Sequence, residues 1–136
     1  MGDEIPAPVA ARVFASERGK LSFAEIGGGL PFAPARYFLV YDVPAGEARG
    51  GHAHRSCEQY MVAVSGTVSV TLDDGASRTG HTLDRPDLGL HVPAGIWGEQ
   101  RYLTGDARLL VLASERYDAA DYINDYQQFL TWKAER

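Results

Sequence analysis

Short runs of strand-forming residues, separated at close intervals by glycine, proline or aspartate, are the feature that most restricts the fold of this chain. Such runs are typical of all-β sandwiches and barrels. They are Phe38–Val43, Tyr60–Val64, Thr67–Leu72, Leu88–Val92 and Leu109–Leu112. In Thr67–Leu72, valine and leucine alternate with threonine and serine, which predicts a strand with one buried face. The sequence therefore predicts an all-β fold.

Two turns are predicted between these strands. Ser65 and Gly66 separate Tyr60–Val64 from Thr67–Leu72, and we expect them to form a tight hairpin that pairs the two strands. The residues Asp73–Gly75 then end the second of these strands and predict another turn.

The C-terminal end departs from the strand pattern. Asp118 is a predicted helix N-cap, and Asp121 would lie in the first turn, where a negative charge is favourable. The apolar residues that recur there at helical spacing are Tyr122, Ile123, Tyr126, Phe129 and Leu130. We therefore expect one amphipathic α-helix to close the fold, with its aromatic residues in core or dimer contacts.

Length and charge limit the possible functions. The 136 residues fit a single domain, 1–136, that can bury a core without disulfides or metals. With 13 basic and 18 acidic residues the net charge is −5, which argues against nucleic acid as a partner. No apolar run approaches the ~20 residues of a membrane span, and Met1–Ala11 lacks the apolar segment of a secretory signal. We therefore expect a cytoplasmic protein that contacts no membrane, with the single cysteine, Cys57, as a buried apolar residue.

A pair of histidines lies between two strand-breaking glycines. His52 and His54 are two residues apart, so on a strand they project from the same face, and Glu58 shares their parity. Gln59 has the opposite parity, so only one of Glu58 and Gln59 should face a pocket directly. Two imidazoles and a carboxylate on one wall indicate a functional site.

The spacing from Gly46 through this histidine pair to Gly66 resembles the first motif of the cupins, and Gly89 to Gly98 resembles the second. Metal-binding cupins place a third histidine where this chain has Gly98. A metal would then have only His52, His54 and Glu58 as ligands, a set that a 2-His-1-carboxylate site still allows. We expect no metal, and we keep the metal-dependent cupin as an alternative.

Further segments follow one another in order over nearly the whole chain, from about Arg12 to Leu130. They are Arg18-Gly19, Arg36, 41–44, 49–54, Glu58-Gln59, 72–75, Gly89-Leu90, Pro93 with 97–99, and 111–114 through Tyr122-Ile123. Together they resemble the dTDP-4-keto-6-deoxyglucose 3,4-ketoisomerases, the FdtA/QdtA or WxcM-like family. The resemblance implies a metal-free, cofactor-free β-barrel of the RmlC-like jelly-roll cupin type that forms homodimers. It also implies action on a dTDP-linked sugar, in the synthesis of amino sugars for surface glycans such as lipopolysaccharide or S-layer glycans.

Apart from the resemblance to this family, the residue types themselves suit a shift of a keto group along a sugar. Moving a keto group from C4 to C3 of a sugar requires removal of the C3 proton and delivery of one to C4 through an enediol. Imidazole is the side chain whose unperturbed pKa suits this work near pH 7. The resemblance implies that His54 is the main base and that His52 relays a proton or polarises an oxygen.

The remaining predicted site residues bind substrate. The guanidinium groups of Arg18, Arg36 and Arg49 are candidates for the diphosphate, which they can bind bidentately. Trp97 is a candidate for stacking on the base or sugar ring. We also expect Glu58 or Gln59 to contact the substrate. The residues Arg18 and Gly98 leave the C4 configuration of the product open.

Two further alternatives stay open. The chain could bind a nucleotide sugar without turning it over, as a sensor or scaffold. An epimerase of the RmlC type would ordinarily be longer and would need a distant aspartate and tyrosine beside the histidine, which the sequence does not place.

Overall fold

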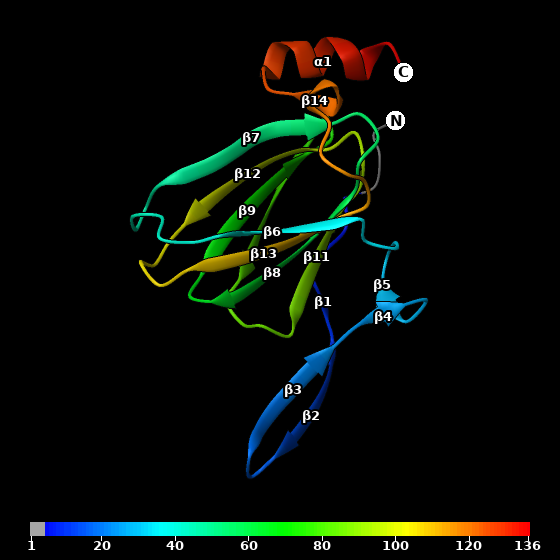
Figure 1. Cartoon of the computed structure of the whole chain (residues 1–136). Coiled ribbons are helices and arrows are strands. Elements are labelled where there is room, and N and C mark those ends of the chain that lie inside the picture. Colours follow the sequence, from blue (N-terminus) through cyan, green and yellow to red (C-terminus); the bar gives the residue numbers. More distant parts are fainter. Residues whose placement is uncertain (1–4) are drawn as a thin grey trace.

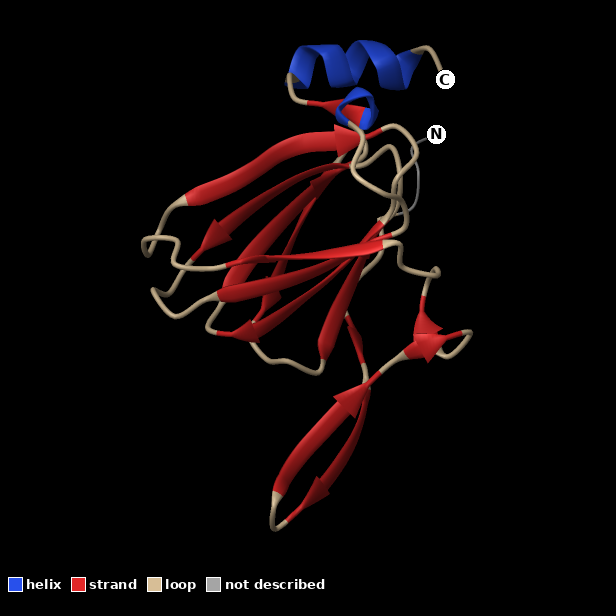
Figure 2. Cartoon of the chain, in the orientation of Figure 1, coloured by secondary structure: helices blue, strands red, loops and turns tan. Residues whose placement is uncertain are grey.

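Two antiparallel sheets face each other in the computed structural model, which describes residues 5–136 (Figures 1 and 2). One sheet has the order β1-β11-β8-β13-β6 and the other β10-β9-β12-β7-β14. The first comprises Val9–Ala10, Leu88–Val92, Gln59–Ser65, Arg108–Ala113 and Arg36–Val40, in that order. The second comprises Arg78–Leu83, Val68–Asp73, Trp97–Tyr102, Ala48–His54 and Tyr122–Ile123. The all-β prediction is confirmed, with a jelly-roll-like sandwich whose two sheets do not join into a closed barrel.

The core lies between the sheets and takes alternate side chains from each. Val68, Val70 and Leu72 are fully buried, as their alternation with polar residues predicts. From the opposite sheet, Met61 and Val111 pack into the same cluster.

Strands β8 and β9 do not form the predicted hairpin. Strand β8 pairs with β11 and β13, whereas β9 pairs with β10 and β12, so Ser65 and Gly66 connect the two sheets. Gly66 has a φ of +66°, and a Cβ there would collide with Ala107 and Thr104. Glycine is therefore needed at position 66 because the chain passes from one sheet to the other where there is no room for a side chain. It does not form a two-residue turn. The predicted turn at Asp73–Gly75 is confirmed, because β9 and β10 pair across it.

The C-terminal helix is confirmed, but it begins later than predicted. Asp118 caps only one 3₁₀ turn, Ala119–Asp121, and the chain then extends as β14 along the edge of β7. Helix α1, Tyr126–Ala134, starts at its own N-cap, Asp125. The prediction failed because an unpaired strand edge at His54 competes with helix formation and takes Tyr122 and Ile123 into the sheet.

Helix α1 lies across one end of the second sheet, next to β14 (Figure 1). Phe129 is fully buried there and packs against Trp97, with ring centroids 5.7 Å apart. The Tyr126 hydroxyl donates a 2.6 Å hydrogen bond to the buried Asp73, which also forms an ion pair with Arg78. The helix therefore holds β14 against β7. Over the described residues, no helix is long and apolar enough to cross a membrane.

A hairpin of β2, Arg12–Ser16, and β3, Gly19–Phe23, projects away from the sandwich (Figure 1). Its apolar side chains are largely uncovered, with Phe14 70% and Leu21 58% exposed. A short parallel pair, β4 (Glu25–Ile26) and β5 (Gly29–Leu30), follows before β6.

Candidate active site

A β-bulge in strand β7 sets the geometry of the site. Gly50 lies opposite Glu99 and His52 lies opposite Gly98, so Gly51 has no partner in the register. Gly50 and Gly51 have φ values of +89° and +74°, which glycine adopts without strain. In a regular strand, residues three apart point to opposite faces. The extra residue instead turns Arg49 and His52 toward the same side.

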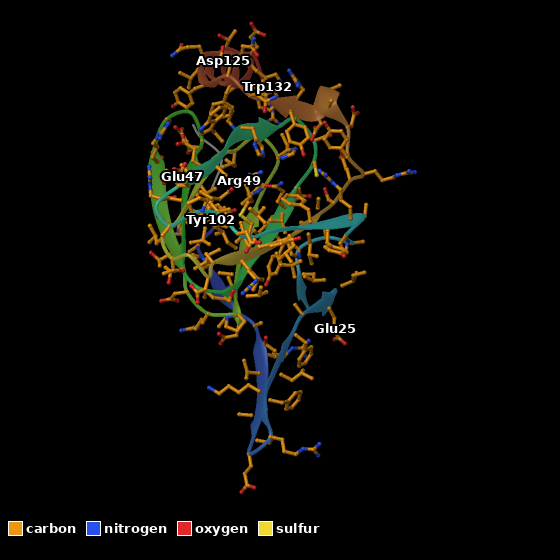
Figure 3. The ribbon with its side chains drawn as sticks, turned by 60° about the vertical axis from the view of Figure 1, so that its left-hand side comes forward. Glu25, Glu47, Arg49, Tyr102, Asp125 and Trp132 are labelled. Atoms are coloured by element: carbon orange, nitrogen blue, oxygen red, sulfur yellow. The ribbon has the colours of Figure 1, made fainter. Side chains whose placement is uncertain are left out.

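Both residues line a small cavity between the two sheets, of about 80 Å³. Its lining residues are Phe38, Val40, Arg49, Gly50, His52, Gln59, Met61, Gln100, Leu109 and Val111. Tyr102 lies close by on β12 (Figure 3). Burial raises the pKa of Tyr102 to about 12, against an opposing effect of the Arg49 charge. Arg49, which is itself exposed, thus brings a positive charge to the rim of this cavity.

The two histidines sit together, and burial keeps both in the neutral form. Their ring centroids are 5.0 Å apart in an edge-on arrangement. Burial, with a further contribution from His54, lowers the pKa of His52 to about 4. Burial also lowers the pKa of His54, although Asp121 opposes the shift. Two unprotonated imidazoles near pH 7 can accept protons.

Asp121 holds His54, and the sequence analysis missed this role. Its Oδ2 is 2.8 Å from His54 Nδ1, and its Oδ1 accepts a 2.7 Å hydrogen bond from the Ser56 backbone N–H. Burial acts to raise the pKa of Asp121, but the hydrogen bonds from Ser56 and His54 hold it below its usual value. A carboxylate can only accept, so Nδ1 carries the hydrogen and Nε2 is the basic atom. His54 Nε2 is buried and bonds to no residue among 5–136.

Tyr122 and Arg36 complete the surroundings of the histidines. The Tyr122 ring lies 4.4 Å from the His54 ring and 5.1 Å from the His52 ring, centroid to centroid. Arg36 donates to the Tyr122 hydroxyl at 3.3 Å and to the Glu115 carbonyl at 3.0 Å. An aspartate and a tyrosine, Asp121 and Tyr122, therefore lie beside the two histidines.

Three predicted site residues lie away from the histidine pair and its cavity. Glu58 points away from the histidine pair and bonds His91, with Oε1 2.7 Å from Nε2. Trp97 is 5% exposed and packs beneath α1, and it is not among the residues that line the cavity. Arg18 is exposed between β2 and β3, in the projecting hairpin. Strand parity turns Trp97 outward and Gln59 inward, and of Glu58 and Gln59 only Gln59 lines the cavity.

The metal set proposed from sequence does not fit this geometry. With Glu58 bound to His91, His52 and His54 lack the third ligand of a 2-His-1-carboxylate site. Among residues 5–136, the donors that do converge are His54, Cys57 and Asp121, within 4.8 Å of one another. Two of these three are already bonded to each other.

The two-sheet jelly roll with its histidine pair on β7 defines a cupin-type protein of the RmlC-like class. The family described as "FdtA: WxcM-like, C-terminal" matches residues 9–134. The TDP-4-oxo-6-deoxy-alpha-D-glucose-3,4-oxoisomerase of Aneurinibacillus thermoaerophilus is 39% identical over 112 residues, covering 82% of this chain and 81% of the relative. The chain belongs to the FdtA, or WxcM-like, family.

Two solved structures resemble the chain over nearly its full length. A 3,4-ketoisomerase from Helicobacter canadensis has a TM-score of 0.90 at 33% identity, covering 93% of this chain and 96% of the other. A histidine-to-asparagine variant of the ketoisomerase QdtA from Thermoanaerobacterium thermosaccharolyticum, in complex with TDP-4-keto-6-deoxyglucose, also has a TM-score of 0.90. Its identity is 28%, with 96% of this chain and 94% of the other covered.

Replacing Asp121 tests the electrostatic part of this site. Asp121→Asn removes the negative charge that raises the pKa of His54, so that pKa should fall further below its usual value. An NMR pH titration of the histidine ring protons measures the shift. Asp125→Asn is the matched control, because asparagine also caps helices and Asp125 lies on the same segment. An unchanged His54 pKa in Asp121→Asn would contradict the assignment.

Proposed function

We propose that this chain is a sugar-nucleotide 3,4-ketoisomerase that converts dTDP-4-keto-6-deoxyglucose into a dTDP-3-keto-6-deoxyhexose. The observation that carries the proposal is the pair of neutral histidines beside a cavity, one of them oriented by a carboxylate. A family member bound to TDP-4-keto-6-deoxyglucose supports the choice of substrate. A cytoplasmic location remains a prediction.

The reaction needs only proton transfers. His54 Nε2 takes the proton from C3, the C–H electrons form a C3=C4 double bond, and the former keto oxygen on C4 is protonated to give the enediol. The hydroxyl on C3 then loses its proton as the C3 keto group forms, and C4 receives a proton. Oxidation at C3 balances reduction at C4, so no redox cofactor is required. His52, which lines the cavity, is suited to relay protons or to polarise an oxygen.

Arg49 is the proposed contact for the diphosphate. It lies on the cavity wall three residues before His52, and its guanidinium hydrogen-bonds to no other residue in the described range 5–136. The Arg36 guanidinium donates hydrogen bonds to Glu115 and Tyr122, so it is not free to bind a phosphate bidentately. It contributes positive charge beside His54 instead. A guanidinium without a protein partner is available for bidentate phosphate binding.

Replacement of His54 tests the base. His54→Asn keeps a similar size but cannot accept the C3 proton at pH 7, and loss of a general base costs ~10²–10⁴ in rate. Turnover of dTDP-4-keto-6-deoxyglucose, followed by NMR, should collapse, and solvent deuterium should no longer enter at C3. The Kd for dTDP should change by less than about tenfold, equivalent to ~1.4 kcal/mol, because Arg49 is intact.

His52→Asn separates the two histidines. It should slow turnover while still allowing C3 exchange if its work is the later relay. C3 exchange at the wild-type rate in His54→Asn would transfer the base role to His52. Normal turnover in both variants would exclude catalysis by this site, and dTDP binding without any turnover in the wild type would favour the non-catalytic alternative.

Chelation tests the metal-dependent alternative. Because Gly98 replaces the third cupin histidine and Glu58 is bonded to His91, we expect EDTA to leave the turnover rate unchanged. Elemental analysis of the purified protein should find little metal. Activity lost on chelation and restored by iron or zinc would establish the metal-dependent cupin instead.

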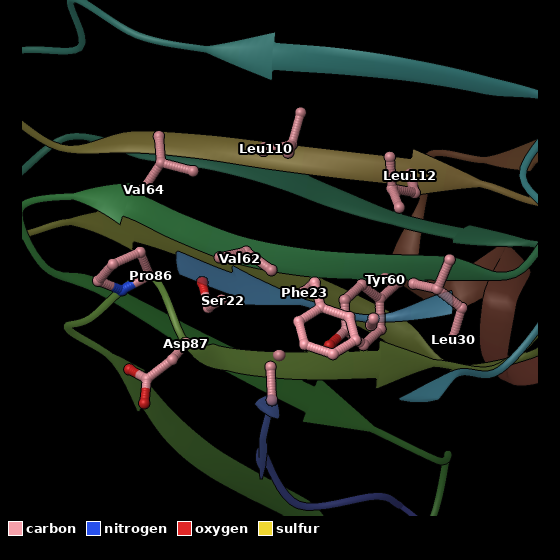
Figure 4. A pocket seen from close by; sticks show the side chains of 13 residues that line it. Ser22, Phe23, Leu30, Tyr60, Val62, Val64, Pro86, Asp87, Leu110 and Leu112 are labelled. Carbon is pink, nitrogen blue, oxygen red and sulfur yellow. The ribbon is translucent and has the colours of Figure 1, made fainter. Parts of the chain in front are cut away.

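We further propose a homodimer in which the β2–β3 hairpin of one copy packs on the other. The outer face of the first sheet carries an apolar hollow of about 300 Å³, lined by residues that include Val62, Val64, Leu110 and Leu112 (Figure 4). The hairpin offers uncovered apolar side chains of its own, such as Phe14 and Leu21. Association of two copies would cover both surfaces. It would also give Arg18 a route to a second copy's site.

Sedimentation at micromolar concentration should give a dimer mass. If Arg18 acts across the dimer, Arg18→Ala and His54→Asn, each impaired alone, should regain activity when their chains are mixed and allowed to exchange. Each mixed dimer then holds one site with both His54 and the partner's hairpin arginine. A monomer mass would refute the dimer, and absence of complementation would confine Arg18 to its own chain or to no role.

A further inference from the structure

Two carboxylates meet at the hydroxyl group of Ser56, behind the His54 ring. Ser56 Oγ lies 3.0 Å from Asp121 Oδ1 and 2.9 Å from Glu115 Oε1. Asp121 holds His54 with its other oxygen, since Oδ2 is 2.8 Å from Nδ1. These contacts form one continuous chain that runs from the Glu115 carboxylate through Ser56 and Asp121 to the imidazole of His54.

The hydrogen of the Ser56 hydroxyl cannot satisfy both carboxylates. A serine hydroxyl carries one hydrogen, and ionised carboxylates only accept hydrogen bonds. Glu115 and Asp121 therefore compete for it, although Asp121 also accepts a 2.7 Å bond from the Ser56 backbone N–H. When Glu115 takes the hydroxyl hydrogen, Asp121 loses a donor, and more of its negative charge is left to stabilise a proton on His54.

Glu115 is held in place by the backbone around it. Its carbonyl oxygen accepts a 3.0 Å hydrogen bond from Arg36 Nε. The preceding residue, Ser114, donates its N–H to the Glu58 carbonyl at 2.9 Å, and the Glu58 N–H donates to Ser114 Oγ at 2.8 Å. The segments that carry Ser56 and Glu115 are thus joined beside both residues. A carboxylate on a mobile surface side chain contributes little to its neighbours, whereas Glu115 is partly buried and fixed.

The charges around His54 oppose one another. Burial is the largest cause of the lowered pKa of His54, and the positive charge of Arg36 also lowers it. The bond to Asp121 and the negative charge of Glu115 act in the opposite direction. The other titratable side chains beside the ring are those of His52, Cys57 and Tyr122. Glu115 therefore acts on His54 without touching it.

We propose that Glu115 and Ser56 are positioning residues for the isomerisation, and that they act through Asp121 to stabilise the proton that His54 takes from C3. The proposal rests on the proposed function and adds two residues to its machinery. Neither residue is among those that line the cavity, so their effect reaches the substrate only through His54.

Glu115→Gln tests the outer carboxylate, because glutamine keeps the shape, carries no charge and can donate a hydrogen to Ser56 Oγ. The hydroxyl hydrogen is then left to Asp121, so the pKa of His54 should fall further below its usual value. An NMR titration of the histidine ring protons measures this change. Because a weaker base removes a proton more slowly, kcat should fall about three- to tenfold. The Kd for dTDP should change by less than about twofold.

Asp118→Asn is the matched control. It removes one negative charge from the same segment, and asparagine can still accept the hydrogen bond that Asp118 receives from the Ala120 N–H. The control should leave both the pKa of His54 and kcat unchanged.

The pH dependence of the rate separates this role from a purely structural one. Neutral His54 removes the proton, so kcat/KM falls as the pH drops through the pKa of His54. In Glu115→Gln that pKa is lower, so the acidic limb of the profile should move to lower pH while the plateau above it falls. A variant in which the segment is only loosened would lose rate and melting temperature without that shift.

Replacements of Ser56 test the link between the two carboxylates. Ser56→Thr keeps a hydroxyl and should keep the wild-type pKa of His54, whereas Ser56→Ala removes the hydrogen for which the carboxylates compete. In the Ser56→Ala background, Glu115→Gln should therefore change the pKa of His54 less than it does in the wild type. This comparison is a double-mutant cycle, which measures the coupling of the two side chains.

Equal pKa values of His54 in Glu115→Gln and in Asp118→Asn would overturn the proposal. So would an effect of Glu115→Gln that is the same with and without the Ser56 hydroxyl. Both titrations are made without substrate. They remain distinct from failure of the isomerase proposal, which is absence of product with the wild type.

Discussion

The two-glycine bulge of β7 is the local constraint on which the site depends. Positive φ values at Gly50 and Gly51 insert one extra residue opposite Gly98 and Glu99. Without that residue, Arg49 and His52 would project to opposite faces of the sheet, and the guanidinium of Arg49 would be separated from the histidines. The same bulge lets the Gln100 amide lie against Gly50. The bulge thus brings the side chains of Arg49, His52 and Gln100 to the same side of the second sheet.

The second constraint is the end of the chain. Strand β14 pairs with β7 at His54 and Ala53, and the residue before it, Asp121, orients the His54 ring. Helix α1 fixes this segment by burying Phe129 and by bonding Tyr126 to Asp73. Trp97 packs in the same apolar cluster as Phe129 and Ile123, so its ring faces helix α1 and not the cavity.

Local patterns were enough to predict the strands, the all-β class and the histidine pair, because each depends on residues one or two positions apart. They were not enough for contacts that depend on how the sheets assemble. Ser65 and Gly66 satisfy the chemistry of a hairpin turn equally well when they cross between sheets. Asp121 is 67 residues from His54 and resembles an ordinary acid at a helix start. Glu58 was placed by assuming a regular strand, but β7 ends at His54 and the chain turns before β8 begins.

The unequal surroundings of the two histidines favour a division of labour between them. Desolvation lowers the pKa of both, but Asp121 counteracts it only at His54. When an imidazole takes a proton from carbon, the new positive charge must be stabilised, and a hydrogen-bonded carboxylate does this for His54. His52, with a pKa of about 4, gives up a proton readily and stores one poorly. Groups whose environments separate their pKa values are suited to different steps of one proton transfer. The structure therefore favours His54 for removing the C3 proton and His52 for passing protons on.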